Sequence, residues 1–129
     1  MKLDIQNDVN LFMQAAEQRV TTTPKAKTFD NKDPQTELYM KLVQEEFDET
    51  LDAFTKGDII ELADGIADTV WVLMGLASSA GIPFDAVWDE VKASNMSKVV
   101  DGKLLKREDG KVMKPDGYFK PDLNAVLFW

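Results

Sequence analysis

Two clusters of carboxylates, set eleven residues apart, constrain this chain more than any other feature. The first covers residues 45–49, Glu-Glu-Phe-Asp-Glu, and the second runs from Glu61 through Asp64 to Asp68. Nine of the 23 acidic residues lie between positions 45 and 68, where Lys56 is the only base. So many acids on neighbouring elements repel one another unless a cation lies between them. We therefore expect a hard divalent ion with oxygen ligands, Mg²⁺ in the first place.

Composition excludes several kinds of function. The chain has 129 residues and a net charge of −8, which argues against a nucleic-acid partner, because such proteins normally present a basic face. It contains neither cysteine nor histidine, so disulfides, thiolate nucleophiles, Ser-His-Asp catalysis and most zinc sites are ruled out. Acid–base chemistry must come from carboxylates, lysine, tyrosine or a water held by a metal. No stretch approaches the length of a membrane span and no signal peptide is recognisable, so we expect a cytoplasmic protein with no membrane partner.

Helix signals divide residues 4–98 into four helices, expected at about 4–20, 34–56, 58–80 and 83–96. The first carries a face made of Ile5, Val9, Phe12, Met13 and Ala16. The stretch 21–24 ends it, and a polar loop follows over 24–33. Asp33 and Asp58 are the expected N-caps, while Gly57 and Gly81 are the expected stops.

The tail after Lys98 differs in character from the helices. Residues 104–113 predict a short hairpin with Asp109-Gly110 at its turn, and the chain closes on an apolar run at 125–129. Seven of the 15 basic residues lie between Lys98 and Lys120. The pattern predicts one all-α domain over 1–129, a bundle of four to five helices with its core at 34–98 and a tail at 99–129.

A helical wheel places several acids on the apolar side of their helices. Glu46 lies inside the apolar arc of the second helix, and Glu49 lies near its edge. On the third helix Glu61, Asp64 and Asp68 form one narrow stripe, and most of the remaining surface is apolar, as is typical of a buried helix. A core-facing carboxylate is costly unless it is paired, protonated or bound to metal. We therefore expect a buried acidic stripe that faces the second helix and completes an octahedral cage of oxygens.

Structural explanations exist for single acids. Glu45 could be an ordinary surface residue paired with Lys41 one turn away. Glu61 could complete a capping box with Asp58. The rest of the stripe lies among apolar residues, which disfavours a purely structural explanation of the whole set.

The two clusters resemble the motif shared by the all-α nucleoside triphosphate pyrophosphatases: MazG-like enzymes, dimeric dUTPases and dCTPases, and phosphoribosyl-ATP pyrophosphatase. That motif is Glu-x-x-Glu, a spacer, then Glu-x-x-Asp, and here it reads Glu46-x-x-Glu49 and Glu61-x-x-Asp64. The similarity covers about residues 38–98. The tail resembles small phage-type members described as phosphoribosyl-ATP pyrophosphohydrolase-like. The resemblance implies the all-α fold of that family.

The resemblance also implies roles for individual residues. The expected Mg²⁺ ligands, with Mn²⁺ as a substitute, are Glu46, Glu49, Glu61 and Asp64, and Asp68 accompanies them. Glu45 matches a position that orients or deprotonates the attacking water, or binds a further metal. Asn95 and Lys98 match an Asn and a Lys that lie near the nucleotide, although a helix C-cap and a helix-end base explain them equally well. Lys41 is a further candidate for contact with phosphate.

The expected reaction is Mg²⁺-dependent hydrolysis of a nucleoside triphosphate, a dNTP in the first place, to the monophosphate and pyrophosphate. The alternatives are phosphoribosyl-ATP hydrolysis, a non-catalytic helical bundle that binds metal or nucleotide, and a bundle whose acids only solubilise it. Residues that could contact the base are Phe12, Gln14, Gln18, Trp71 and Trp88, although aromatic residues at helical spacing more often fill a core. A homodimer or homotetramer is expected from the apolar surface and from the resemblance.

Overall fold

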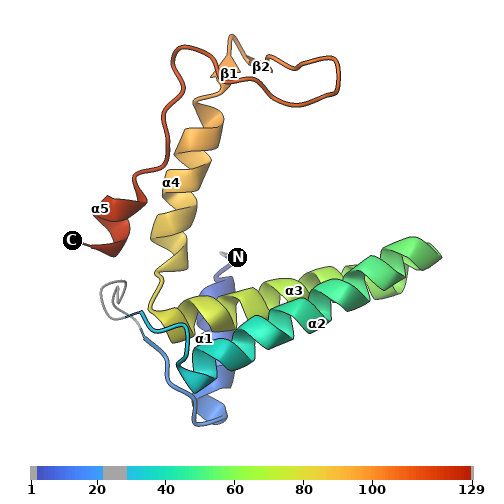
Figure 1. The fold of residues 1–129 in the computed structure, drawn as a ribbon, viewed down its shortest axis with the longest axis vertical. Coiled ribbons are helices and arrows are strands. Elements are labelled where there is room, and N and C mark those ends of the chain that lie inside the picture. Colours follow the sequence, from blue (N-terminus) through green and yellow to red (C-terminus); the bar gives the residue numbers. More distant parts are fainter. Residues whose placement is uncertain (1–2, 22–28, 129) are drawn as a thin grey trace. The chain divides into compact units, whose positions relative to one another are not determined.

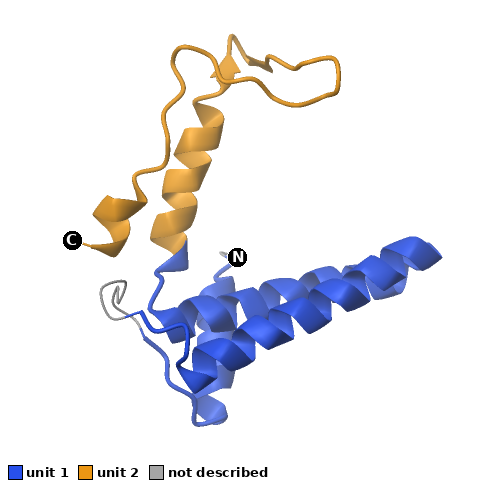
Figure 2. Cartoon of the chain, viewed as in Figure 1, with its two compact units in different colours: residues 1–84 blue, residues 85–129 orange. Residues whose placement is uncertain are grey.

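The computed structural model describes residues 3–21 and 29–128. Its elements are α1 (Ile5–Ala15), α2 (Pro34–Lys56), α3 (Ile59–Ala80), α4 (Phe84–Met96), β1 (Val99–Val100), β2 (Lys103–Leu104) and α5 (Leu123–Leu127) (Figure 1). The chain forms two compact units, residues 1–84 and 85–129 (Figure 2). The expected all-α class is confirmed, while the assignment of 1–129 to one domain stays a prediction.

The bounds of α2 and α3 follow from their caps and agree with the sequence. Asp33 accepts a hydrogen bond from the backbone N–H of Thr36, 3.0 Å away, and Pro34 opens α2. Gly57 ends α2 with φ 70°, a left-handed conformation that is costly for a residue with a Cβ. Asp58 then caps α3.

Helix α1 is shorter than expected. It ends at Ala15 instead of near residue 20, because Glu17 turns into the left-handed region with φ 59°. The residues expected on its buried face differ in burial. Val9 and Met13 are fully buried, whereas Phe12 and Ala16 are exposed. The expected helix stop at 21–24 and most of the polar loop fall on residues 22–28, which lie outside the described part.

Helices α2 and α3 form an antiparallel pair whose register is fixed by two glycines of α3. A Cβ on Gly75 would collide with the ring of Tyr39, and a Cβ on Gly65 would collide with Thr50. The hydroxyl groups of Thr50 and Thr69 lie 3.3 Å apart at the same interface. The two helices therefore approach closely along the pair, with small residues at the contact points.

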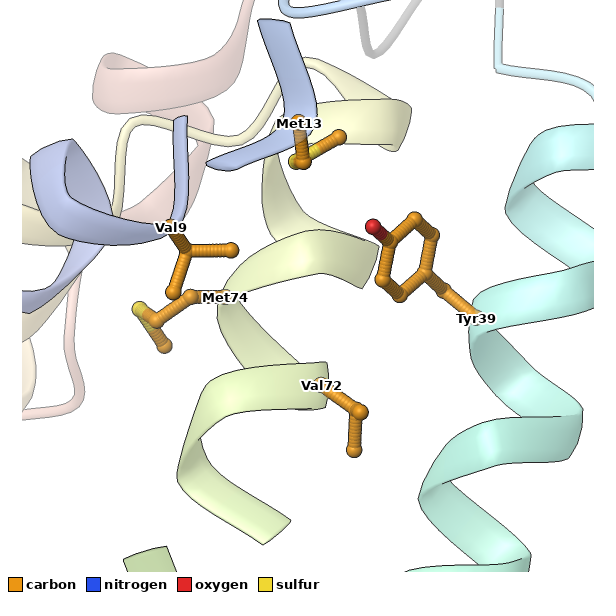
Figure 3. Packing of buried hydrophobic residues seen from close by; sticks show 5 residues of the cluster. All are labelled: Val9, Met13, Tyr39, Val72 and Met74. Carbon is orange, nitrogen blue, oxygen red and sulfur yellow. The ribbon is translucent and has the colours of Figure 1, made fainter. Parts of the chain in front are cut away.

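The hydrophobic core lies where α1 crosses one end of this pair. Figure 3 shows its five buried members, which come from all three helices: Val9, Met13, Tyr39, Val72 and Met74. Polar side chains reinforce the same end, since Gln6 donates to the hydroxyl of Ser78 and to the carbonyl of Ile82. We call residues 34–45 and 70–80 the near half of the pair, and residues 46–69 the far half.

Among the described residues of unit 1, nothing covers the far half in this way. Six of its large apolar side chains are more than half exposed, and three of them lie on α3, which was expected to be a buried helix: Phe47, Leu51, Phe54, Ile59, Ile60 and Ile66. Among the described residues, no single helix has the length and apolar composition of a membrane span, although α3 and α4 pass that test as a bent pair.

Unit 2 contains more structure than the sequence suggested. The hairpin expected at 104–113 is present in reduced form, with Lys106 and Val112 as an isolated bridge. A second hairpin precedes it, in which β1 and β2 pair antiparallel around Asp101-Gly102. Helix α5 begins before the apolar run at 125–129 and overlaps it, and it is the fifth of the four to five helices expected.

Candidate active site

The register of α2 and α3 brings acids of both helices together. The charge of Asp68 on α3 acts on Glu46 on α2, so these two acids lie close together across the pair. Glu46 and Glu49 on α2 and Asp64 and Asp68 on α3 interact electrostatically across the pair. We call these four residues the carboxylate cluster; all four were expected from the sequence.

Glu46 is the innermost member of the cluster. It is half-buried, and of the described side chains it alone has a buried polar atom, Oε2, without a hydrogen-bond partner. Burial raises the pKa of Glu46, and the charges of Glu49, Asp68 and Asp64 raise it further. An unpaired buried carboxylate oxygen is costly, so its presence indicates a position retained for a purpose other than stability.

Asp68 has the same kind of environment from the other helix. It is half-buried, and its pKa is raised by burial first and then by the charge of Asp64, a hydrogen bond with Asp64 and the charge of Glu49. Asp64 and Glu49 are exposed, so they form the solvent-facing side of the cluster. The expectation of a buried stripe was therefore wrong for Asp64, because no described residue of unit 1 covers this flank of α3.

Glu61 lies one turn before Asp64 on α3, at the end of the acidic stripe next to α2's last turn. It is exposed, and its charge acts on Lys56 at the end of α2. Its backbone N–H donates to Asp58 Oδ1 at 3.1 Å, which is the N-cap half of the expected capping box. In a complete capping box the Glu61 carboxylate would accept a hydrogen bond from the N–H of Asp58. Here that N–H donates to the carbonyl of Ala53 instead.

Glu45 and Lys41 lie on the outer surface of α2. Both are exposed, and Lys41 pairs with Glu37 at 3.6 Å instead of with Glu45. The surface ion pair suggested as an explanation for Glu45 is therefore not the one that forms. Glu45 stays without an ion-pair partner among the described residues.

The cluster has the donor chemistry of a magnesium site but not a closed coordination shell. In the described part of the chain, no three acidic side chains converge in the manner of ligands to one ion, so the expected octahedral cage is not formed. The oxygen donors, the unpaired Oε2 of Glu46 and the mutual repulsion that raises two pKa values nevertheless fit a hard cation. Glu46, Glu49, Asp64 and Asp68 are the residues that could hold it.

An aromatic pair lies close to the cluster along α3. The rings of Phe12 and Trp71 meet edge to face, with centroids 5.5 Å apart and planes at 79°. Trp71 lies one turn beyond Asp68, and both rings are partly exposed. Of the other residues suggested for base contact, Gln18 accepts a hydrogen bond from the Tyr39 hydroxyl at 2.6 Å and Gln14 is exposed.

The remaining expected substrate residues belong to unit 2. Lys98 Nζ donates to Asn95 Oδ1 at 3.2 Å, so the pair is assembled at the end of α4. A separate cavity of about 260 Å³ lies in unit 1, lined in part by Arg19, Asp33 and Ser79. Those residues are already bonded to one another, with Arg19 and Asp33 2.7 Å apart.

Comparison with known families identifies the chain. Residues 9–95, more than half of its length, match the family model described as phosphoribosyl-ATP pyrophosphohydrolase. The chain belongs to this family. The match runs from within α1 to the last turn of α4 and includes the whole carboxylate cluster, and it indicates nucleotide pyrophosphohydrolase activity. No curated protein matches the chain.

Proposed function

We propose that this family member hydrolyses a nucleoside triphosphate, with a dNTP as the first candidate, to the monophosphate and pyrophosphate in the presence of Mg²⁺. The observation that carries the proposal is the carboxylate cluster, in which Glu46 keeps a buried oxygen unpaired next to three further acids. Two acids from each helix could hold the cation, and Glu61 joins them as a ligand only through its match to the family motif. Mn²⁺ is a substitute with the same preference for oxygen.

The protein contributes charge placement and control of the attacking water. A Mg²⁺ ion held by Glu46, Glu49, Asp64 and Asp68 would offset the charge of the phosphates and lower the pKa of a bound water. Glu45, exposed and without an ion-pair partner among the described residues, is the proposed acceptor of the proton from that water. The oxygen of water attacks phosphorus, the anhydride bond between the α- and β-phosphates breaks, and pyrophosphate leaves. No histidine is required, which suits a chain that has none.

The aromatic pair supports a position for the base. Trp71 lies one turn from Asp68 and meets Phe12 of α1 edge to face; both rings are partly exposed, and a nucleobase can stack on such rings. We propose this pair as the base contact in place of Gln18, whose amide oxygen is bonded to Tyr39. Asn95, Lys98 and Lys41 are proposed for the phosphates; Lys41 has the weakest support, because it is paired with Glu37.

The test is turnover with a matched pair of variants. The protein is incubated with Mg²⁺ and each of the canonical dNTPs, NTPs and phosphoribosyl-ATP, and monophosphate and pyrophosphate are measured. Glu49→Gln removes a charge from the cluster, and Asp48→Asn removes one from a neighbouring side chain that bonds Gln44 instead. Equimolar release of both products, lost only in Glu49→Gln, supports the proposal. Equal rates in the two variants would exclude the cluster as the active site.

Phosphoribosyl-ATP is the second candidate substrate, and the family match is the observation that favours it. The same cluster would serve, because the bond broken is again an anhydride between phosphates. Release of pyrophosphate from phosphoribosyl-ATP alone would select this alternative. Thermal stabilisation by Mg²⁺ with no turnover on any nucleotide would instead select a non-catalytic binding role.

We also propose that the protein is at least a homodimer, with a tetramer as the larger form. The far half of the α2–α3 pair exposes a row of large apolar side chains that a monomer leaves in water, among them Phe47, Leu51 and Phe54. A second copy would cover this surface. Light scattering that gave the mass of a monomer at micromolar concentration would refute the proposal.

A further inference from the structure

Two lysines in unit 2 share one aromatic ring. Lys98 Nζ lies 5.7 Å and Lys114 Nζ 5.1 Å from the centroid of the Tyr118 ring. Each distance is that of a cation–π contact. The two ammonium groups therefore lie no more than about 11 Å apart, a separation that the two ends of one short chain of phosphates can bridge.

The tail is held in place so that this arrangement forms. The buried hydroxyl of Ser94 on α4 donates to the carbonyl of Phe119 at 2.8 Å, and the N–H of Phe119 donates to the Ser97 hydroxyl at 3.2 Å. A turn in which Tyr118 N–H donates to the carbonyl of Pro115, 3.0 Å away, orients the ring. Two hydrogen bonds to Phe119, the residue after Tyr118, thus attach the tail to the end of α4.

The charges of the two lysines are not balanced by acids. Within the described part of the chain, neither lysine takes part in an ion pair, and the partner of Lys98 is the neutral amide oxygen of Asn95. The dipole of α4 explains a cation at Lys98, but Lys114 is not on a helix. Like charges brought together indicate an anion, by the same reasoning that assigns a cation to the carboxylate cluster.

We propose that Lys98, Lys114 and Tyr118 form a binding site for a phosphate chain, the triphosphate of the substrate or the pyrophosphate product; this inference rests on the proposed function. Ammonium groups serve as point charges for phosphate oxygens, and the phenol can donate a hydrogen bond. A local excess of positive charge is needed because the chain as a whole carries −8 and repels polyanions. Lys114 and Tyr118 thereby join the substrate residues expected from sequence.

The first test measures binding without catalysis. The full chain is titrated with tripolyphosphate in a calorimeter, with a chelator present so that no metal bridges the anion to the carboxylate cluster. Lys114→Met should weaken binding roughly tenfold, as expected for loss of one charge-assisted hydrogen bond. Lys111→Met is the control, because it removes the same charge from the same tail. Equal affinities in the two variants would refute the site.

A second test uses the unaltered protein, so it does not depend on how a variant folds. Lysines are acetylated with and without tripolyphosphate and quantified by mass spectrometry. Protection of Lys98 and Lys114, but not of Lys111 and Lys120, supports the site, and uniform protection or none overturns it. Protection in a protein that hydrolyses no nucleotide would leave this site standing and remove the proposed function. Hydrolysis without protection would do the reverse.

Discussion

The near and far halves of the α2–α3 pair are built from the same two helices but differ in how their side chains are packed. In the near half, Tyr39 and Val72 are buried, and the tyrosine hydroxyl bonds Gln18. In the far half, Glu46 keeps a buried oxygen unpaired while large apolar residues such as Phe54 face solvent. The near half thus buries apolar side chains and pairs its buried polar group. The far half leaves a buried polar atom unpaired and exposes large apolar side chains.

The two halves also shift carboxylate pKa values in opposite directions. At the start of the near half, hydrogen bonds from Arg19 and Thr36 hold the pKa of Asp33 far below its ordinary range. In the far half, burial and neighbouring acids raise the pKa values of Glu46 and Asp68. Stability is thus concentrated where α1 packs, and the strain that a functional site requires is placed beyond it.

The largest effect should follow from removing one charge of the carboxylate cluster. Glu49→Gln is expected to lower the turnover number at least about 100-fold, because stabilisation of phosphate charge is the main contribution to this chemistry. Its urea denaturation midpoint should not fall, since the variant removes a repulsion with Glu46. Steady-state pyrophosphate release and urea unfolding measure the two quantities. A loss of stability in step with activity would mean that the far half is structural after all.

The next effect concerns the near half and should be the mirror image. Met13 is fully buried, and Met13→Ala should lower the free energy of unfolding by about 3 kcal/mol through lost burial and a cavity. The matched control is Met40→Ala, whose side chain is half exposed and whose effect should be within about 0.5 kcal/mol. Activity per folded molecule should be unchanged in both. Equal destabilisation by the two variants would place the core elsewhere.

The helices and the positions of the acids could be predicted from sequence because their signals are local. Asp33, Asp58 and the two stop glycines specify the ends of α2 and α3, and the wheel placed Glu46 on the side that faces α3. The end of α1 was wrong by five residues. Its helical pattern continues past Ala15, and the left-handed Glu17 has no sequence signal.

The burial of the acids could not be predicted in the same way. The apolar surroundings of Asp64 and Asp68 on the wheel suggested a buried stripe. Burial depends on a neighbouring surface, however, and no described residue of unit 1 covers the far half. The tail shows the same limit, because it is held near Lys98 by hydrogen bonds that Phe119 accepts from Ser94 and donates to Ser97, and no sequence pattern predicts these bonds. Periodicity describes a helix, while partners far along the chain decide which of its faces meets water.

A smaller effect should appear in the pH dependence of stability without metal. A carboxyl whose pKa is raised by folding binds protons more tightly in the folded state, so stability is full below its ordinary pKa of 4.5 and is lost as pH rises above that value. Glu46→Gln should remove this loss. The variant should therefore be more stable than the parent above pH 4.5, with a difference that grows as Glu46 ionises. Urea unfolding in a chelator measures it, and a constant difference across pH would show that Glu46 does not titrate anomalously.

The smallest effect should come from Asp33, with the opposite sign. A carboxyl whose pKa is lowered by folding stabilises the protein above its ordinary value of 3.8, and that contribution is lost as pH falls. Asn keeps the N-cap function, so Asp33→Asn should cost little at neutral pH beyond the exposed ion pair with Arg19. Below pH 3.8 the parent should lose stability faster than the variant, until the difference between them closes. Arg19→Met tests the cause, because hydrogen bonding by Arg19 is the largest contribution to the shift. If Arg19→Met left the loss of stability below pH 3.8 unchanged, Arg19 would not be the cause of the lowered pKa of Asp33. The contrast with the raised pKa values of the far half would then fail.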